Sequence, residues 1–249
     1  MEEYIAGKHS VLEALKSGRT IHKIWVADNA QKHYIHPILV EAKASGIVVQ
    51  QTDRRKLDQM VEGVQNQGVV AQVAAYDYAS VEDILAKAES RGEVPFLLIL
   101  DEIEDPHNLG AILRTAECTG LHGIIIPKRR SVGLTATVSK ISVGAIEYVP
   151  VAKVTNLVQT MDKLKERGIW IAGADGAADQ TVYESDLTMP LAVVIGNEAK
   201  GMGRLVRDNC DFLVKLPMVG SINSLNASVA ASVILYEGLR QRRFRETAR

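Results

Sequence analysis

Short, almost purely apolar segments recur from residue 95 onward, and they constrain the fold more than any other feature of the chain. Each is about five residues long, and stretches with helical spacing separate them. Strands that are apolar on both faces are typical of a parallel sheet covered by helices on both sides. The second part of the chain is therefore predicted to be an α/β domain. The expected strands are 96–100, 123–127, 147–151, 169–174, 191–195 and 212–216.

Helices are expected between these strands. Residues 109–119 carry apolar side chains at helical spacing and stop at Gly120, and residues 157–166 stop before Gly168. Glycine directly after the last turn is a common helix end. The final helix is expected to run from near Ser224 to about Arg243.

The first 75 residues have a weaker pattern of the same kind. Strands are expected at 21–26, 46–52 and 68–74, and helices at 33–44 and 54–60, which is enough for a small α/β unit. Residues 76–92 are more polar and carry fewer apolar side chains, although part of them could be helical. The expected organisation is a small domain at 1–75, a linker at 76–92 and a larger domain at 93–249.

Composition excludes several classes of protein. With 29 Lys plus Arg against 30 Asp plus Glu, the net charge is −1, so any nucleic-acid surface must be a local patch. Cys118 and Cys210 stand alone, which argues against a disulfide framework and against zinc, and no metal is expected. No apolar run is long enough to span a bilayer, and the first ten residues lack the pattern of a leader. A cytoplasmic protein is expected.

The first candidate site is the segment 101–120, which follows a predicted strand and enters a helix. Ligands of open α/β sheets bind at that edge. Asn108 is expected to cap the helix, Gly110 permits close backbone approach, and Arg114 lies where an anion is favoured. A plain strand-to-helix connection with a surface arginine explains the segment equally well.

The second candidate is the segment 191–203, where an apolar strand breaks into a glycine loop. A phosphate-binding P-loop would need lysine at the position of Met202, so phosphate binding is disfavoured. The backbone at Gly196 can approach a cofactor, and Glu198 supplies a carboxylate beside it. Taken alone, a tight turn with a solvated acid is the simpler interpretation.

The third candidate is the segment 212–237, in which Pro217 ends a strand and a polar loop leads to the last helix. Ser224 and Asn226 offer a hydroxyl and an amide where that helix begins. The alternative is an ordinary helix cap followed by a core helix. A helix cap requires one polar side chain, so the presence of two favours a binding site.

Three short basic clusters are the remaining hint of a nucleic-acid partner. Each is more often a solvated face than a contact, but together they favour RNA modestly. They are 54–56, 128–130, and the C-terminal group Arg240, Arg242, Arg243 and Arg245.

The three candidate segments become specific when they are taken in order. NLGAILRTA at 108–116, IGNEAKGM at 195–202 and LPMVGSINSLNASVA at 216–230 resemble the three motifs of the SpoU (TrmH) branch of the SPOUT methyltransferases. The resemblance covers about residues 95–245. It implies an RNA 2′-O-ribose methyltransferase that uses S-adenosylmethionine, with a C-terminal α/β fold tied in a trefoil knot. Periodicity does not predict a knot, and general topology rules argue against one.

The N-terminal segment is similar to the small L30-like (L30e-like) domain that binds substrate in the family's large-subunit rRNA members. GKHSV at 7–11, followed by Glu13, Ala14 and Leu15, carries this resemblance. It implies that the substrate is a guanosine ribose in 23S rRNA or a ribosomal precursor, and that the protein is a homodimer. A tRNA ribose 2′-O-methyltransferase and a non-catalytic RNA-binding factor on the same fold remain alternatives.

The resemblance also implies the roles of individual residues. Arginine stays protonated in proteins, so a cation that holds phosphate and stabilises an alkoxide suits Arg114 better than a general base. Asn108 and Glu198 are expected to orient it, while Ser224 and Asn226 hold the ribose. The implied catalytic set is Asn108, Arg114, Glu198, Ser224 and Asn226, and the implied cofactor contacts are Gly196, Leu216, Leu225, Ala174, Met218 and Ser224.

Overall fold

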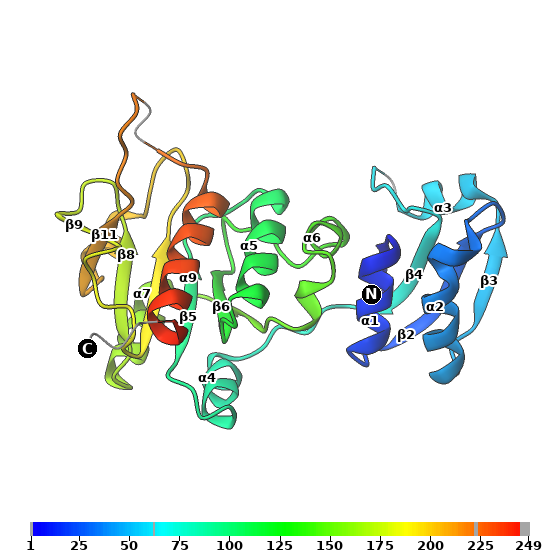
Figure 1. Ribbon diagram of the computed structural model, residues 1–249, viewed down its shortest axis with the longest axis horizontal. Helices are drawn as coiled ribbons and strands as arrows, with labels where there is room; N and C mark the ends of the chain where they lie inside the picture. The colour runs from blue at the N-terminus through cyan, green and yellow to red at the C-terminus, as the bar shows by residue number, and fades with distance from the viewer. Residues whose placement is uncertain (1, 62, 222–223, 245–249) are drawn as a thin grey trace. The chain divides into compact units, whose positions relative to one another are not determined.

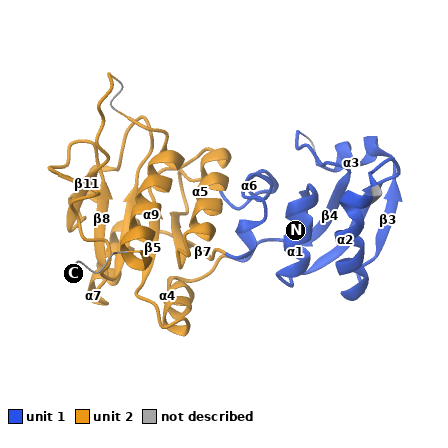
Figure 2. Cartoon of the chain, viewed as in Figure 1, with its two compact units in different colours: residues 1–77, 133–148 blue, residues 78–132, 149–249 orange. Residues whose placement is uncertain are grey.

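A computed structural model describes residues 2–61, 63–221 and 224–244 (Figure 1). They form two compact units, one of residues 1–77 with 133–148 and the other of residues 78–132 with 149–249 (Figure 2). Each is described by itself. Within the described residues, no helix is long and apolar enough to cross a membrane.

Unit 1 is a four-stranded sheet with helices on both faces. The strands have the order β1-β4-β2-β3, in which β4 is antiparallel to β1 and β2, and β3 is parallel to β2. The carboxyl ends of β1, β2 and β3 therefore share one edge. The elements are β1 (Glu2–Ala6), α1 (Lys8–Lys16), β2 (Ile21–Ala27), α2 (Lys32–Ala44), β3 (Val49–Thr52), α3 (Arg54–Met60) and β4 (Val69–Ala74).

Two small cores hold unit 1 together. Ile24 and Val26 of β2 pack with Ile38 of α2 on one face of the sheet. Trp25 packs with Leu57 of α3 on the other face. Alternation along β2 thus buries both faces of the strand, and the expected small α/β unit is confirmed.

Residues 133–148 belong to unit 1, although the sequence places them in the larger domain. They contain α6 (Ala136–Ile141) and a 3-10 turn, η1 (Ala145–Glu147). Glu147 explains the association, because Arg19 Nη1 lies 3.0 Å from its Oε1 and both side chains are buried. The hydroxyl of Tyr76 donates to the same oxygen at 2.9 Å. A buried carboxylate needs such partners, so Glu147 sits in a turn of unit 1 and not at the start of the strand expected at 147–151.

Unit 2 contains the parallel sheet that the apolar segments predict. Its strand order is β7-β6-β5-β10-β8-β11-β9, and every pairing is parallel. All five residues of β5 and of β10 are buried. The strands are β5 (Phe96–Leu100), β6 (Gly123–Pro127), β7 (Val151–Val154), β8 (Trp170–Ala174), β9 (Gln180–Thr181), β10 (Leu191–Ile195) and β11 (Phe212–Lys215).

Most of the expected linker is part of unit 2. Residues 81–90 form α4 (Val81–Ser90), which starts with a capping box between Ser80 and Asp83. Ile84 and Ala88 are buried, and Ile84 packs so closely over β6 that a Cβ on Gly123 would lie 2.6 Å from it. This helix buries two apolar side chains, so the segment carries few apolar residues. This explains why the sequence indicated a linker at 76–92.

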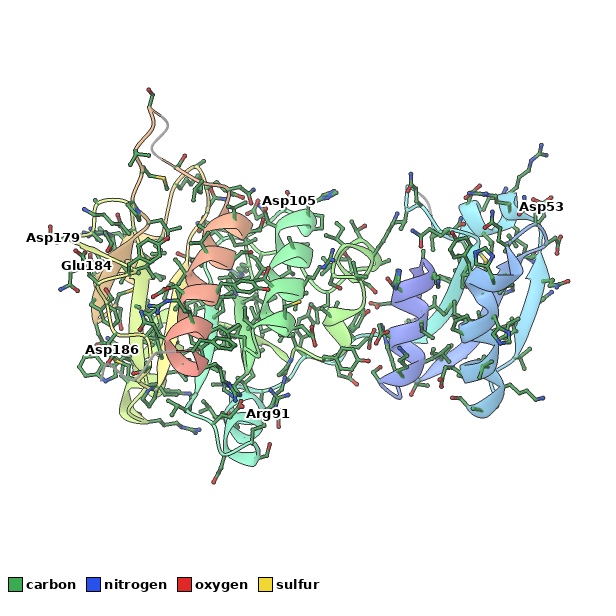
Figure 3. All side chains as sticks on the ribbon, in the orientation of Figure 1. Asp53, Arg91, Asp105, Asp179, Glu184 and Asp186 are labelled. Atoms are coloured by element: carbon green, nitrogen blue, oxygen red, sulfur yellow. The ribbon has the colours of Figure 1, made fainter. Side chains whose placement is uncertain are left out.

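The helices beside the sheet begin at positions that matter for the site. Asp105, and not Asn108, caps α5 (Pro106–Cys118) by accepting a hydrogen bond from His107 N at 2.9 Å; Figure 3 shows Asp105 at this end of α5. Asn226, and not Ser224, caps α9 (Ala227–Arg243). The side chain of Asn108 is therefore free for another task. The remaining helices are α7 (Leu157–Glu166) and α8 (Arg204–Asp208).

Candidate active site

The three motif segments meet at the carboxyl edge of the parallel sheet in unit 2. β10 lies between β5 and β8, with Ile195 opposite Leu100, and β11 pairs with the far side of β8. The loops that leave β5, β10 and β11 therefore emerge side by side. Open α/β sheets bind ligands at this edge.

Asn108, Glu198 and Asn226 form a hydrogen-bonded cluster at this edge, with one residue from each motif. Asn226 Nδ2 donates to Asn108 Oδ1 at 2.9 Å and lies 3.3 Å from Glu198 Oε1. Asn108 Nδ2 donates to the same Glu198 oxygen. We call this set the amide–carboxylate cluster. Both amides thus direct a donor at the same oxygen of Glu198.

The orientation of Asn226 is fixed from its other side. Its Oδ1 accepts hydrogen bonds from the backbone N–H of Ser228 at 3.0 Å and of Val229 at 3.3 Å, which caps α9. Only Nδ2 is then left to face the cluster. The start of α9 thus positions the Nδ2 donor of Asn226 beside Asn108 and Glu198, which follow β5 and β10.

The loop that carries Glu198 is tightly folded. A Cβ on Gly196 would lie 2.3 Å from the carbonyl carbon of Gly201 and from the nitrogen of Met202, so no side chain fits there. Asn197 and Gly201 exchange two backbone hydrogen bonds, of 3.1 Å and 2.8 Å. The glycine proposed from the sequence is therefore required by close backbone approach.

Asp101 ties this loop to the end of β5, a role that the sequence analysis missed. Its Oδ2 accepts a hydrogen bond from Gly203 N at 2.7 Å, and the residue is buried. Burial raises the pKa of this carboxyl above its ordinary value, while the bond from Gly203 opposes the rise. An acid directly after a fully apolar strand was the signal that could have identified it.

A cavity of about 150 Å³ lies beside the amide–carboxylate cluster. All six residues expected to contact the cofactor line it: Ala174, Gly196, Leu216, Met218, Ser224 and Leu225. Glu198 and Asp175 also line it and bring two carboxylates to the same space. The structure therefore gathers residues from three strand ends around one cavity.

Asp175 is the second site residue that the sequence analysis missed. Arg207 Nε donates to its Oδ2 at 2.6 Å, and Ala177 N donates to its Oδ1 at 2.8 Å. Burial alone would raise the pKa of Asp175, but these hydrogen bonds outweigh burial and hold the pKa below its ordinary value. The cavity therefore faces an ionised carboxylate at neutral pH.

Arg114 lies away from the cluster. It is six residues after Asn108 on α5, which places it about 9 Å further along the helix and about 120° around it. Its side chain is exposed. Within the described part of the chain it has no ion pair or hydrogen bond. Ser224 lines the cavity, but the structure gives its hydroxyl no described hydrogen-bond partner.

The C-terminal basic cluster has a structural role. Arg242 donates to four backbone carbonyls, those of Leu187 at 2.8 Å, Met189 at 2.6 Å, Val94 at 2.9 Å and Pro95 at 3.4 Å. Burial lowers the pKa of its guanidinium to about 10. Arg240 pairs with Glu237 at 2.8 Å, and Arg245 lies outside the described residues. Because the donors of Arg242 bond to backbone carbonyls within the fold, the structure does not support an RNA contact by this residue.

Comparisons with known proteins agree with this geometry. Residues 95–236 match the model of the SpoU rRNA Methylase family, and residues 4–79 match a model described as RNA 2′-O ribose methyltransferase substrate binding. A relative in Bacillus subtilis (strain 168), described as a TrmH family tRNA/rRNA methyltransferase, is 57% identical over 240 residues, which are 96% of both chains.

Solved structures share the fold. The SpoU methyltransferase AviRb from Streptomyces viridochromogenes, in complex with AdoMet, is 26% identical, has a TM-score of 0.81, and the match covers 97% of this chain and 90% of that one. The A. aeolicus TrmH/SpoU tRNA modifying enzyme is 30% identical, with a TM-score of 0.55 over 60% of this chain and 76% of its own.

The fold, the site and the matches together define an RNA methyltransferase with an N-terminal substrate-binding domain. The chain belongs to the SpoU rRNA methylase family, which is also called the TrmH family, and its α/β fold is that of the SPOUT methyltransferases.

Proposed function

We propose that this protein transfers a methyl group from S-adenosylmethionine to the ribose 2′-oxygen of a guanosine in 23S rRNA, in the cytoplasm. The observation that carries the proposal is the amide–carboxylate cluster of Asn108, Glu198 and Asn226, which lies beside a cavity at the carboxyl edge of the sheet. The match of residues 4–79 to a substrate-binding model for RNA 2′-O ribose methyltransferases supports the reaction class.

The cavity has the chemistry that this cofactor requires. Ala174, Leu216 and Leu225 give it apolar walls. Its charged lining is the two carboxylates of Asp175 and Glu198 with one cation, Lys215, and this excess of negative charge favours a ligand with positive charge. S-adenosylmethionine carries an ammonium and a sulfonium, and it supplies an electrophilic methyl carbon. A volume of about 150 Å³ is smaller than the roughly 300 Å³ of an ordinary small-molecule pocket. Met218 and Leu225 line the cavity and are half-exposed, so their side chains have room to move outward when a ligand binds.

Positioning is the main task of the protein in this reaction. Attack on a methyl carbon is an in-line displacement, so the ribose oxygen must be held about 3 Å from that carbon in the right direction. Ser224 lines the cavity, and its hydroxyl suits contact with the ribose. Asn226 uses its oxygen to cap α9 and its nitrogen to hold Asn108 and Glu198, so it acts as a positioning residue.

Arg114 is assigned the role of holding the RNA phosphate. Its guanidinium stays protonated, so it stabilises negative charge on the reacting oxygen but does not accept the proton. The proton leaves to the RNA phosphate or to water. The exposure of Arg114 keeps its five donors available.

A homodimer is proposed on two grounds. Apolar side chains are exposed around the cavity and along α9, and an exposed apolar patch indicates an interface. In addition, Arg114 stands away from the cluster of its own chain, so a second copy can bring another Arg114 to each site. The exposed side chains are Met218, Val219, Leu225, Val229 and Tyr236. Light scattering measures the mass of the purified protein in solution. We expect the mass of two copies, and the mass of one copy would contradict the homodimer.

Ribosomal RNA is the first candidate because the family model that matches residues 95–236 is described as an rRNA methylase. The likeness to the A. aeolicus tRNA modifying enzyme covers only 60% of this chain. The name of the B. subtilis relative includes both tRNA and rRNA, so tRNA is the second candidate.

The test is transfer of labelled methyl from S-adenosylmethionine to protein-free 23S rRNA, to ribosomal particles and to bulk tRNA. We expect label at a single guanosine of 23S rRNA, in the free RNA or in the particle, mapped as one position that resists alkaline hydrolysis. Label in tRNA alone would replace the proposal by the tRNA alternative. Absence of label from all three substrates would contradict an enzymatic function and favour an RNA-binding role.

A further inference from the structure

Unit 1 has a cavity of about 500 Å³ at the edge of its own sheet. β1, β2 and β3 all end at this edge, and the segments that follow them supply the lining. Lys8 and His9 come from the start of α1, Asn29 and Gln31 from the loop after β2, and Arg54 from the start of α3. The cavity thus occupies in unit 1 the place where α/β sheets bind ligands.

Two glycine positions keep the walls of this cavity fixed. Gly7 has a φ of 97° and Gly68 a φ of 80°, a region of backbone conformation that side chains disfavour. Gly7 N donates to Val69 O at 3.1 Å, and Lys8 N donates to Gln67 Oε1 at 3.2 Å. The turn after β1 is therefore tied to the segment before β4.

The fully charged side chains that line this cavity are positive. Of the described residues that line it, Lys8 and Arg54 are cations and none is an acid. Neither cation forms an ion pair with any described residue. The nearest acid in sequence, Asp53, caps α3 by accepting from Arg55 N at 2.7 Å, and Figure 3 shows it at that end of the helix. The two cations are thus available to an anionic ligand.

An exposed aromatic ring stands at the same cavity. Tyr34, near the start of α2, leaves 51% of its surface exposed. Its ring centroid is 3.9 Å from that of His33, and Lys8 Nζ lies 5.0 Å from its centre. About half of the surface of Tyr34 remains exposed beside these two contacts, and that part is available to a stacking base.

Side-chain amides complete the lining. Asn29, Gln31 and Gln67 each carry both donors and acceptors, which match the edges of nucleobases. Cations for phosphate, a ring for stacking and amides for base edges are the three elements by which proteins bind single-stranded RNA.

We propose that this cavity holds one unstacked nucleotide of the RNA substrate, at a site separate from the cavity in unit 2. The inference rests on the proposed function, because it names how the substrate RNA is captured. A base in a duplex has its faces covered by its neighbours, so Tyr34 can stack only on a base from a loop, a bulge or a strand end. Arg54 and Lys8 then contact the phosphates on either side of it.

The stacking half of the proposal is tested by binding of the full chain to protein-free 23S rRNA. Tyr34→Ala is expected to weaken binding about tenfold, since loss of stacking on one base commonly has that effect. Tyr34→Phe retains the ring and is expected to bind as the unaltered protein does. Val40→Ala, an exposed position on the same helix, is the matched control. Affinity for S-adenosylmethionine and the melting temperature report on folding, and both should be unchanged.

The phosphate half is tested by the salt dependence of the same binding. Arg54→Gln is expected to reduce the slope of log affinity against log salt by about 0.7, the value for one contact to a single strand. Arg55→Gln, which removes the neighbouring charge that does not line the cavity, should leave the slope unchanged. Tyr34→Ala should lower affinity at every salt concentration without altering the slope.

Two results would overturn the inference. If Tyr34→Ala and Arg54→Gln bind 23S rRNA as their controls do while the protein still methylates it, the nucleotide site is wrong and the proposed function stands. If guanosine monophosphate alone binds the full chain at micromolar concentration and does not compete with RNA, the cavity is a small-ligand site instead. Failure of the unaltered protein to label any RNA contradicts the proposed function separately.

Discussion

Asn226 Nδ2 donates a hydrogen bond to Asn108 Oδ1 at 2.9 Å, and this bond joins the first motif of the chain to the last. The same side chain caps α9 through its oxygen. The two functions of this amide can be separated by substitution, because an aspartate retains the capping oxygen but loses the donor.

Asn226→Asp is expected to lower the rate of methyl transfer about a hundredfold, the scale of a lost positioning interaction. The new carboxylate would also repel Glu198. The cap of α9 is retained in this variant, whereas Asn226→Ala should in addition lower the free energy of unfolding by about 1 kcal/mol through loss of the cap. Steady-state transfer and urea unfolding measure the two effects. A normal rate for Asn226→Asp would show that the donor has no role.

Arg114→Lys is expected to lower the turnover of methyl transfer by about 10²- to 10³-fold, with unchanged affinity for S-adenosylmethionine. Lysine keeps the charge but cannot grip a phosphate with two parallel donors. Arg240→Lys is the control, because Arg240 is exposed and paired with Glu237. A near-normal rate for Arg114→Lys would exclude the bidentate phosphate contact.

Gly196→Ala is expected to abolish cofactor binding and to lower the free energy of unfolding by about 1–3 kcal/mol, the usual effect of overpacking. The added methyl group would meet backbone atoms of Gly201 and Met202, which cannot turn aside as the end of a flexible side chain can. Gly220→Ala, where a Cβ meets nothing within 4 Å, is the matched control. Calorimetric titration with S-adenosylmethionine and urea unfolding provide the two readings. If both variants bind equally well, the cofactor does not depend on this loop.

His122 gives unit 2 a dependence on pH. Burial lowers the pKa of its imidazole below 6.5, even though Glu93 opposes the shift. Nδ1 accepts from Phe96 N at 3.0 Å, so the folded protein requires the neutral ring with its proton on the other nitrogen, 3.0 Å from Glu93 Oε2. Because the folded-state pKa is depressed, the stabilisation is present above pH 6.5 and is lost as the pH falls through the folded-state value.

His122→Asn keeps an acceptor for Phe96 but removes the titrating group. The free energy of unfolding should therefore fall more between about pH 7 and about pH 5 in the unaltered protein than in the variant. Urea unfolding at the two pH values measures the difference. Parallel losses in both proteins would assign the pH dependence to other groups.

The sequence predicted the sheet of unit 2 well because its strands are apolar on both faces. The bounds of β5, β6 and β10 agree with the expectation. It failed where pairing between distant residues decides the structure. Arg19 and Glu147 are 128 positions apart, and no local pattern indicates that residues 133–148 pack with unit 1.

The residues of the candidate site divide in the same way, into those that sequence motifs predicted and those that depend on contacts between distant residues. The resemblance supplied Asn108, Glu198 and Asn226, whereas the structure shows that they bond to one another. Asp101 and Asp175 had no motif to mark them, and their roles come from the backbone N–H of Gly203 and from Arg207, which only the fold brings close. The position of Arg114 on another face of α5 was not predicted either. The helix was expected to begin at residue 109, three residues later than it does, with Asn108 as its cap and not as part of the same helix.

The measurement that tests the central claim most directly is the identity of the methylated nucleoside. The protein would be incubated with S-adenosylmethionine and the RNA it labels, and the product digested to nucleosides for mass spectrometry, with Asn226→Asp as the inactive comparison. We predict 2′-O-methylguanosine, with the added mass on the ribose fragment. Added mass on the base fragment would contradict ribose methylation by the site at Asn108, Glu198 and Asn226.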